Sequence, residues 1–382
     1  MSRTIQQARR TPPEGTDASQ LRFSTLDGLR GIAALAVLQF HAQNLFGGHL
    51  RSSYLAVDLF FLLSGLVLSH AYEERLKRGM SVRRFMLIRI VRLYPLYILG
   101  TLVGAAFFLA SHVFGTSEYS LVGIAIAFVF AVLFMPTPAG VFSGDISLYP
   151  FVYPAWSLFF ELTANYLYSA TLPAQATRFL MSVVGLGAVL LIWSAFQFEG
   201  LDAGISWSGF SGGFGRVIFS FFLGVLLFRF PLTWRGNGLH AVLCVVVLIP
   251  IFAVPVSKDY RAIFDLAVVI FVFPTLAAIA AASEGSLRFR QCFALLGKCS
   301  YAIYAVHAPV LWWTTRVSSR VFGVQLTDLA PASGVAVLVM LSLLAFALDR
   351  YYDSPVRRIL MRRLSDRKLP DQNSVSRSSA KA

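Results

Sequence analysis

The chain has 382 residues, of which 57% are hydrophobic and only 14% are charged, and its mean hydropathy is +0.67. Soluble domains carry about 25% charged residues, so this composition excludes a soluble enzyme and indicates a polytopic membrane protein. The net charge of +14 concentrates in residues 1–30, 75–92 and 350–368. These stretches flank apolar segments and carry no nucleic-acid-binding motif, so we expect them to face anionic lipid head groups of the bilayer and not nucleic acid.

Apolar segments fill most of the chain between two polar tails. Residues 1–22 are polar and basic and predict a disordered tail. Eleven apolar segments follow, near 29–46, 56–72, 90–111, 119–135, 155–172, 178–196, 213–230, 239–256, 262–282, 300–322 and 331–349. They leave no room for a soluble domain, so we predict one all-α integral membrane domain at 23–360. A second disordered tail is predicted at 361–382.

The basic loops set the number of membrane crossings. The N-terminal tail, the 75–92 loop and the C-terminal tail are all basic, and we expect all three on the cytoplasmic side. This requires an even number of crossings, so one of the eleven segments is not a full span. We predict about ten transmembrane helices. The conflict lies between 93 and 135, where one segment is expected to be re-entrant or merged with its neighbour.

Arg30 and His41 lie eleven residues apart in the first apolar run. This spacing is about three helical turns, so both side chains share one helix face, about 16 Å apart along the axis. Ionisable residues inside a membrane segment are costly and mark candidate functional sites. The alternatives are a snorkelling anchor for Arg30 and a helix-packing hydrogen bond for His41.

Arg89 and Arg92 lie three residues apart where a helix enters the membrane. This spacing puts both guanidinium groups on one side of the helix, and each planar guanidinium can bond two phosphate oxygens at once. They are therefore candidates for binding a phosphorylated ligand. Positive-inside anchoring is the alternative, and we assign that role to Arg83 and Arg84.

Two carboxylates lie in apolar segments and need partners. Asp58 opens the second segment, and Glu161 lies inside the fifth, one turn before Asn165. Either carboxylate is a candidate to orient the imidazole of His41, as carboxylates do for catalytic histidines. The alternatives are a helix-end role for Asp58 and a salt bridge from Glu161 to an arginine such as Arg216.

Other polar positions give weaker signals. Ser300, Tyr304 and His307 share a helix face, and packing with hydrogen bonding is the favoured interpretation. No HExxH, GxSxG, P-loop or Cys/His metal spacing occurs, so no metal is expected. The loops at 137–154 and 199–213 contain side chains that can stack on or hydrogen-bond to sugars, although interfacial belts have the same composition: Asp145, Tyr149, Tyr153 and Trp207.

Taken together, these blocks resemble acyltransferase family 3, a family of membrane O-acyltransferases. The resemblance covers about residues 21 to 360, and its matching stretches are Leu26–Ala34 leading to His41, Val57–Phe61 with Ser64 and Gly65, Arg89–Pro95, Trp156–Glu161, and Gly297–His307. It implies about ten helices in a bacterial inner membrane and an acyl-CoA donor on the cytoplasmic side. It also implies transfer to a hydroxyl of a carbohydrate or lipid-linked glycan.

The resemblance and the residues suggest the same chemistry. His41 is the expected catalytic base, with Glu161 or Asp58 orienting it, and a covalent acyl-histidine is the rival mechanism. The phosphates of acyl-CoA, most simply acetyl-CoA, are expected at Arg30, Arg89 and Arg92. The alternative function is a transporter or flippase of lipid-linked sugars or acyl groups. The chain ends soon after its last span, so any second transfer step is expected to need a separate glycan-synthesis partner.

Overall fold

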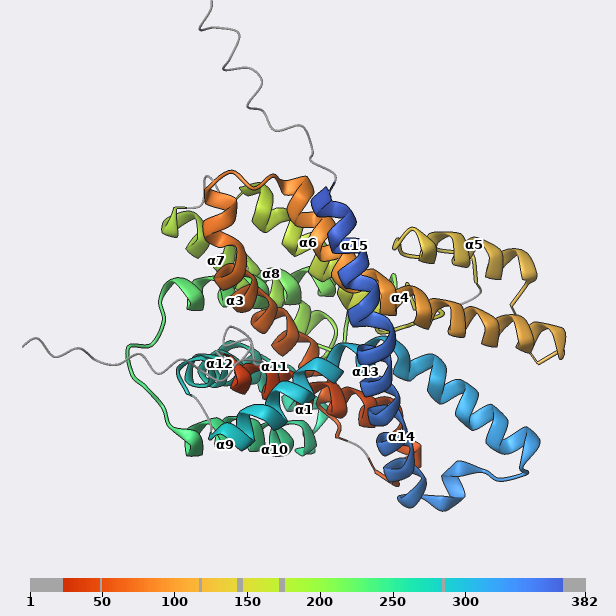
Figure 1. Cartoon of the computed structure of the whole chain (residues 1–382). Coiled ribbons are helices and arrows are strands. Elements are labelled where there is room, and N and C mark those ends of the chain that lie inside the picture. The colour runs from red at the N-terminus through yellow and green to blue at the C-terminus, as the bar shows by residue number, and fades with distance from the viewer. Residues whose placement is uncertain are drawn as a thin grey trace, which may run out of the picture.

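The computed structural model describes residues 23–48, 50–116, 119–142, 147–171, 176–283 and 286–366. Within these ranges the chain is almost entirely helical and contains no β-strand, which confirms the all-α prediction (Figure 1). The helices of the first half are α1 (Ser24–His41), α2 (Gln43–Phe46), η1 (Ser53–Leu55), α3 (Ala56–Lys77), α4 (Val82–Val113), α5 (Leu121–Val132), α6 (Ala155–Thr171) and α7 (Thr177–Gln197). Those of the second half are α8 (Phe210–Arg229), α9 (Gly238–Val246), α10 (Leu248–Ala253), α11 (Lys258–Ala267), η3 (Val268–Val272), α12 (Phe273–Ala282), α13 (Leu287–Val321), η4 (Leu326–Leu329), α14 (Ala332–Leu348), η5 (Asp349–Asp353) and α15 (Ser354–Asp366).

Several helices are long and apolar enough to cross a membrane. Among the described residues there are 6 by length and composition: Ser53–Lys77, Val82–Val113, Thr177–Gln197, Phe210–Arg229, Lys258–Ala282 and Ala332–Leu364. This supports a multi-pass membrane protein. The helices α1, α6 and α13, which carry Arg30, His41, Glu161 and His307, do not meet the same criteria. The predicted number of about ten spans stays a prediction.

The stretch between 93 and 135 contains one incomplete segment. Helix α4 runs without interruption to Val113, although it contains Pro95. Helix α5 has 12 residues, which is about 18 Å of helix against a hydrocarbon core of about 30 Å. It lies beside the far part of α4 (Figure 1). A second short apolar segment is Gly238–Ala253, so the position of the incomplete span stays a prediction.

Several predicted boundaries differ from those of the structure. Helix α1 ends at His41, so the imidazole lies at a helix end and not deep inside the predicted 29–46 segment. The predicted 239–256 segment is divided into α9 and α10. Helix α15 continues to Asp366, so a disordered tail beginning at 361 is wrong. Residues 1–22 and 367–382 lie outside the described residues.

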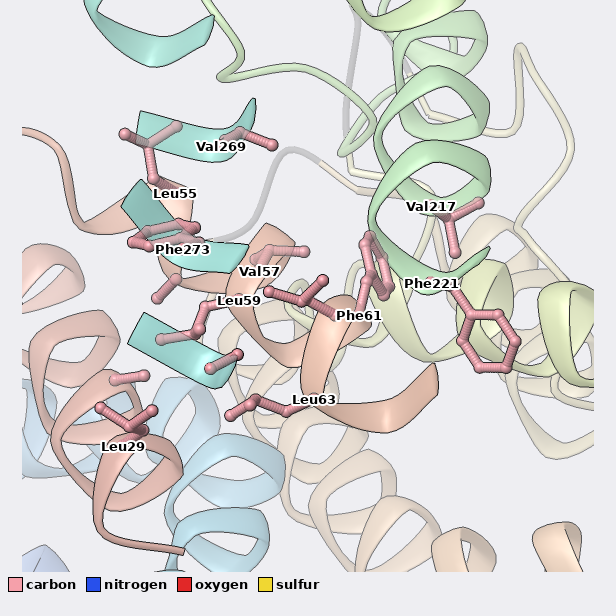
Figure 2. Packing of buried hydrophobic residues seen from close by; sticks show 14 of the residues in the cluster. Leu29, Leu55, Val57, Leu59, Phe61, Leu63, Val217, Phe221, Val269 and Phe273 are labelled. Carbon is pink, nitrogen blue, oxygen red and sulfur yellow. The ribbon is translucent and has the colours of Figure 1, made fainter. Parts of the chain in front are cut away.

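The core is centred on the crossing of α3 and α8 (Figure 2). Phe61 of α3 and Phe221 of α8 are buried there. A methyl group at Gly65 would collide with the carbonyl oxygen of Phe221, and one at Gly224 would collide with the carbonyl oxygen of Leu62. Only glycine at these two positions lets the backbones approach so closely, as small residues do at helix contacts in membranes.

Candidate active site

The two long helices that pack most extensively against each other, α1 and α13, each contribute a histidine. Nδ1 of His41 lies 3.0 Å from Nε2 of His307, and the two rings are stacked with centroids 5.1 Å apart. His307 is fully buried, whereas His41 is half-buried. The partner of the predicted base is therefore a second imidazole and not a carboxylate.

Backbone carbonyls fix the direction of this hydrogen bond. Nδ1 of His307 lies 3.0 Å from the oxygen of Ile303 and 3.1 Å from that of Tyr304. A carbonyl oxygen can only accept, so Nδ1 of His307 carries its proton and its Nε2 is the acceptor. Nδ1–H of His41 then donates to this Nε2. The second nitrogen of His41, Nε2, is left with a free lone pair, as a base or a nucleophile requires.

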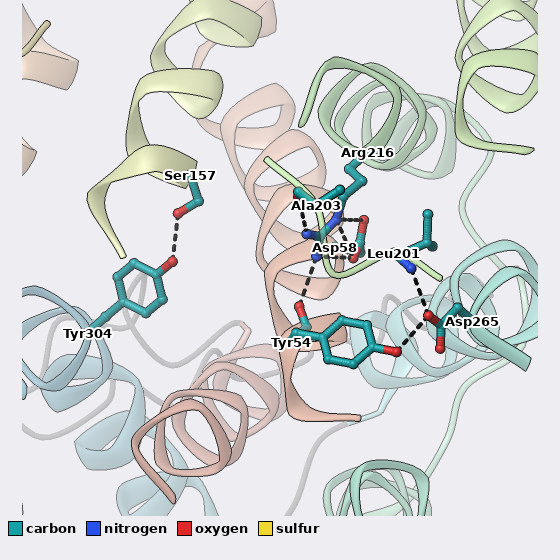
Figure 3. Close-up of polar contacts among 8 residues, drawn as sticks. All are labelled: Tyr54, Asp58, Ser157, Leu201, Ala203, Arg216, Asp265 and Tyr304. Carbon is teal, nitrogen blue, oxygen red and sulfur yellow. Dashed lines mark hydrogen bonds and ion pairs between the residues drawn. The ribbon is translucent and has the colours of Figure 1, made fainter. Parts of the chain in front are cut away.

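Aromatic side chains surround the pair. The ring of Tyr153 meets His41 edge-on with centroids 4.6 Å apart, and Trp312 lies 5.7 Å from Tyr153. Tyr304, whose ring lies near His307, has its hydroxyl 2.7 Å from that of Ser157 (Figure 3). The same hydroxyl donates to the carbonyl of Pro154. The last two contacts tie the start of α6 to α13 and hold the histidine pair in place.

Asp58 is not a partner of His41, so that prediction is wrong. Its carboxylate forms a buried ion pair with Arg216, with Nη2 and Oδ2 2.7 Å apart (Figure 3). The same guanidinium donates to the carbonyl oxygens of Ala203 and Tyr54. An arginine stays charged when it is buried, so it needs a carboxylate partner. A neutral histidine needs only a hydrogen bond.

Glu161 also pairs with an arginine and not with His41. Its Oε1 accepts from Nη2 of Arg89 at 2.8 Å and from the hydroxyl of Ser64 at 2.6 Å. The alternative of a salt bridge was therefore correct in kind, but the arginine is Arg89 and not Arg216. Asn165, one turn beyond Glu161, is fully buried, and neither of its amide atoms has a partner within the described chain.

The three arginines predicted to bind a phosphorylated ligand are neighbours in space. Arg30 lies within electrostatic range of Arg92 and Glu161, and Arg89 lies within range of both other arginines. We call Arg30, Arg89 and Arg92 the donor-side arginines. In the part of the chain that the structure describes, the guanidinium groups of Arg30 and Arg92 form no hydrogen bond or ion pair. Their bonding capacity is available to a ligand.

Of the residues predicted to contact a sugar, one lies at the histidine pair and two contact other groups. Tyr153 lies against His41, but Tyr149 is buried and donates to the carbonyl of Phe134. Trp207 is exposed and donates to the carbonyl of Thr137, away from the histidine pair. Asp145 lies outside the described residues.

Two residues of the site were not predicted to belong to it. His307 was identified in the sequence, but its favoured role was packing. Nothing in the local sequence separates Trp312 from an interfacial aromatic. No group of three or more His, Cys, Asp or Glu among the described residues is arranged to hold a metal ion.

His41, with its free lone pair, ends α1, and Arg30, beside the other donor-side arginines, lies about three turns away along that helix. The chain belongs to acyltransferase family 3: the family model described as "Acyltransferase domain" matches residues 23–349. It is therefore an acyltransferase. The matched region contains the histidine pair and all three donor-side arginines.

Two of the following three relatives are named as an acyltransferase or a transacylase. The chain is 40% identical to "Protein 2 in picA locus" of Rhizobium radiobacter over 198 residues, which cover 49% of this chain and 98% of that protein. It is 26% identical to "Acyltransferase MdmB" of Streptomyces mycarofaciens over 92% of this chain and 96% of that protein. It is 27% identical to "Putative membrane-bound transacylase BcsY" of Komagataeibacter xylinus over 37% of this chain and 35% of that protein. No solved structure matches the chain.

Proposed function

We propose that this acyltransferase moves an acetyl group from acetyl-CoA to a hydroxyl of a carbohydrate, such as a surface polysaccharide or lipid-linked glycan. The observation that carries the proposal is the free Nε2 lone pair of His41, fixed by the chain of hydrogen bonds through His307. We place the protein in a bacterial inner membrane, with both termini in the cytoplasm, because its basic segments flank the apolar helices.

In this proposal His41 acts as the general base. Its Nε2 accepts the proton of the acceptor hydroxyl while the oxygen attacks the thioester carbonyl. The C–S bond then breaks, and the imidazolium returns the proton to the leaving thiolate. His307 steadies the imidazolium because Nδ1–H of His41 keeps its acceptor throughout. General-base help of this kind is worth about 10²–10⁴ in rate.

The donor-side arginines support the choice of donor. A CoA thioester supplies an activated acyl group at one end and phosphates at the other. Arg30 and His41 lie on the same helix, about 16 Å apart along its axis, and His41 is its last residue. A donor held by its phosphates near Arg30 would extend toward His41.

The aromatic rings beside His41 support a carbohydrate acceptor. Tyr153 and Trp312 form a tilted pair next to the imidazole. Neither the Tyr153 hydroxyl nor the Trp312 indole N–H has a hydrogen bond within the described residues. A sugar ring stacked on them would place a hydroxyl near Nε2 of His41, and aromatic faces with a polar tip suit such a ligand.

Purified full-length protein with acetyl-CoA and a glycan acceptor tests the proposal. We expect release of free CoA coupled to acceptor acetylation, and a loss of about 10²–10⁴-fold in His41→Ala. His240→Ala is the matched control, because this half-buried histidine lies in the cap of α9 and its ring contacts Asn237 and Trp234, not the histidine pair. Retained transfer in His41→Ala would exclude the proposed base.

The same preparation separates the rival interpretations. An acetylated His41 peptide trapped by rapid quenching would replace the general-base step with a covalent one, since Nε2 is also the nucleophilic atom. Movement of a lipid-linked sugar across a vesicle membrane without thioester cleavage would instead support a transporter.

A further inference from the structure

Helix α15 adds arginines next to the candidate site. It begins at Ser354, after the last residue of the family-matched region, and packs along α4 (Figure 1). Between the two helices lies an open cavity of about 470 Å³, which we call the α15 cavity. Its lining includes Tyr72 of α3, Arg92 of α4, and Ser354, Arg357, Arg358 and Met361 of α15.

The charges around the α15 cavity are unbalanced. Three guanidinium groups line it, and no carboxylate does. Arg357 is paired with Asp353 at 3.0 Å and Asp349 at 3.5 Å, but Arg92 still repels it electrostatically. Arg358 is exposed, and its only hydrogen bond within the described residues is to the backbone oxygen of Ser354 at 3.3 Å. Arg92 and Arg358 therefore retain most of their donors.

This arrangement suits phosphate. Guanidinium groups bind phosphate oxygens in pairs, and the bonds are charge-assisted. An anion in the α15 cavity would relieve the repulsion between Arg92 and Arg357. Arg92 connects the cavity to the candidate site, because it also lies within electrostatic range of Arg30.

We propose that Arg357 and Arg358 of α15, together with Arg92, bind the nucleotide phosphates of the CoA donor. The inference rests on the proposed function. It deepens that function by assigning donor recognition to a helix that lies outside the family-matched region. Arg30 and Arg89 are then left to hold the part of the donor nearer to His41.

Binding of adenosine 3′,5′-bisphosphate tests the proposal without catalysis, because this probe carries the nucleotide phosphates but no thioester. The full-length protein is placed in phosphatidylcholine nanodiscs. We expect Arg358→Gln to weaken binding about tenfold, as the loss of a charge-assisted hydrogen bond does. Arg357→Gln should have a similar effect. Arg363→Gln is the matched control, because it removes the same charge from an exposed position on the opposite face of α15.

A lipid phosphate has the same chemistry, and a second arm separates the two sources. If an anionic lipid occupies the α15 cavity, bisphosphate binding will be equal in wild type and variants, and phosphatidylglycerol will stabilise wild type more than Arg358→Gln. That result overturns the proposal. Equal KM values for acetyl-CoA in wild type and Arg358→Gln, with His41-dependent turnover intact, overturn this inference alone. A wild-type protein that binds the bisphosphate through Arg358 but never cleaves acetyl-CoA overturns only the proposed function.

Discussion

Asp58 and Glu161 are both carboxylates paired with an arginine, yet their surroundings differ. Neither Asp58 nor Arg216 has any side-chain exposure, and Arg216 also bonds two backbone carbonyls (Figure 3). The side chains of Arg89 and Glu161 are 8% and 16% exposed, and Nε of Arg89 has no partner within the described chain. The first pair has no bonding capacity left for a ligand, whereas the second has.

The saturated pair belongs to a larger network that holds the fold. The hydroxyl of Tyr54 donates to Asp265, and Asp265 also accepts from the backbone N–H of Leu201. Together with the ion pair, these contacts tie η1, α3, α8 and α11 to the loop before α8. The candidate site has shorter chains of contacts, His41 to His307 and Arg89 to Glu161, and they leave donors and a lone pair free for a ligand. This difference separates scaffold from site better than burial alone.

The largest expected effect is on stability, at the saturated pair. Asp58→Asn leaves the charge of Arg216 buried and unpaired, so we expect the free energy of unfolding to fall by about 3–5 kcal/mol. Unfolding of the purified protein in mixed micelles measures it. If Asp58→Asn were as stable as wild type but inactive, Asp58 would belong to the site and the comparison would fail.

A smaller effect is expected on turnover, at His307. His307→Phe removes the acceptor of Nδ1–H of His41 and should lower kcat by about 10–100-fold, the value of a hydrogen bond to a group that becomes charged. His307→Gln should recover part of the activity, because its amide oxygen can accept the same proton. Equal activity in the two variants would show that His307 only fills space.

The smallest effect is expected on donor binding, at the unsaturated pair. Arg89→Gln removes one of the donor-side arginines, so KM for acetyl-CoA should rise about tenfold with little change in kcat. Stability should change far less than in Asp58→Asn, because Glu161 is partly exposed and keeps its bond to Ser64. Arg84→Gln, on the exposed face of the same helix, is the control. A stability loss equal to that of Asp58→Asn would make Arg89 a structural residue.

Local patterns predicted the helices and the placement of the arginines. Apolar runs located most of the long helices, and the i, i+3 spacing put Arg89 and Arg92 on one side of the same helix. The partners of the charged groups could not be predicted in the same way. His41 and His307 are 266 positions apart, and Asp58 and Arg216 are 158 apart. Such pairings depend on which helices pack together, and helix packing cannot be predicted from the local periodicity of the sequence.

The predicted roles of Asp58 and Glu161 failed for a related reason. Both carboxylates were predicted to orient His41, but each forms an ion pair with an arginine instead. A buried guanidinium stays charged, so it needs a carboxylate partner more than a neutral imidazole does. When several buried bases are present, carboxylates are better assigned to arginines first.

The crossing of α3 and α8 has a consequence for how this chain can vary. Gly65 and Gly224 face each other's helix backbone, so even alanine at either position would force the two helices apart. Asp58 and Arg216 lie on the same two helices. The glycines and the ion pair are therefore expected to be inherited together as one unit. New acceptor specificities are then expected to arise at the rim, around Tyr153 and Trp312, while the α3–α8 crossing stays fixed.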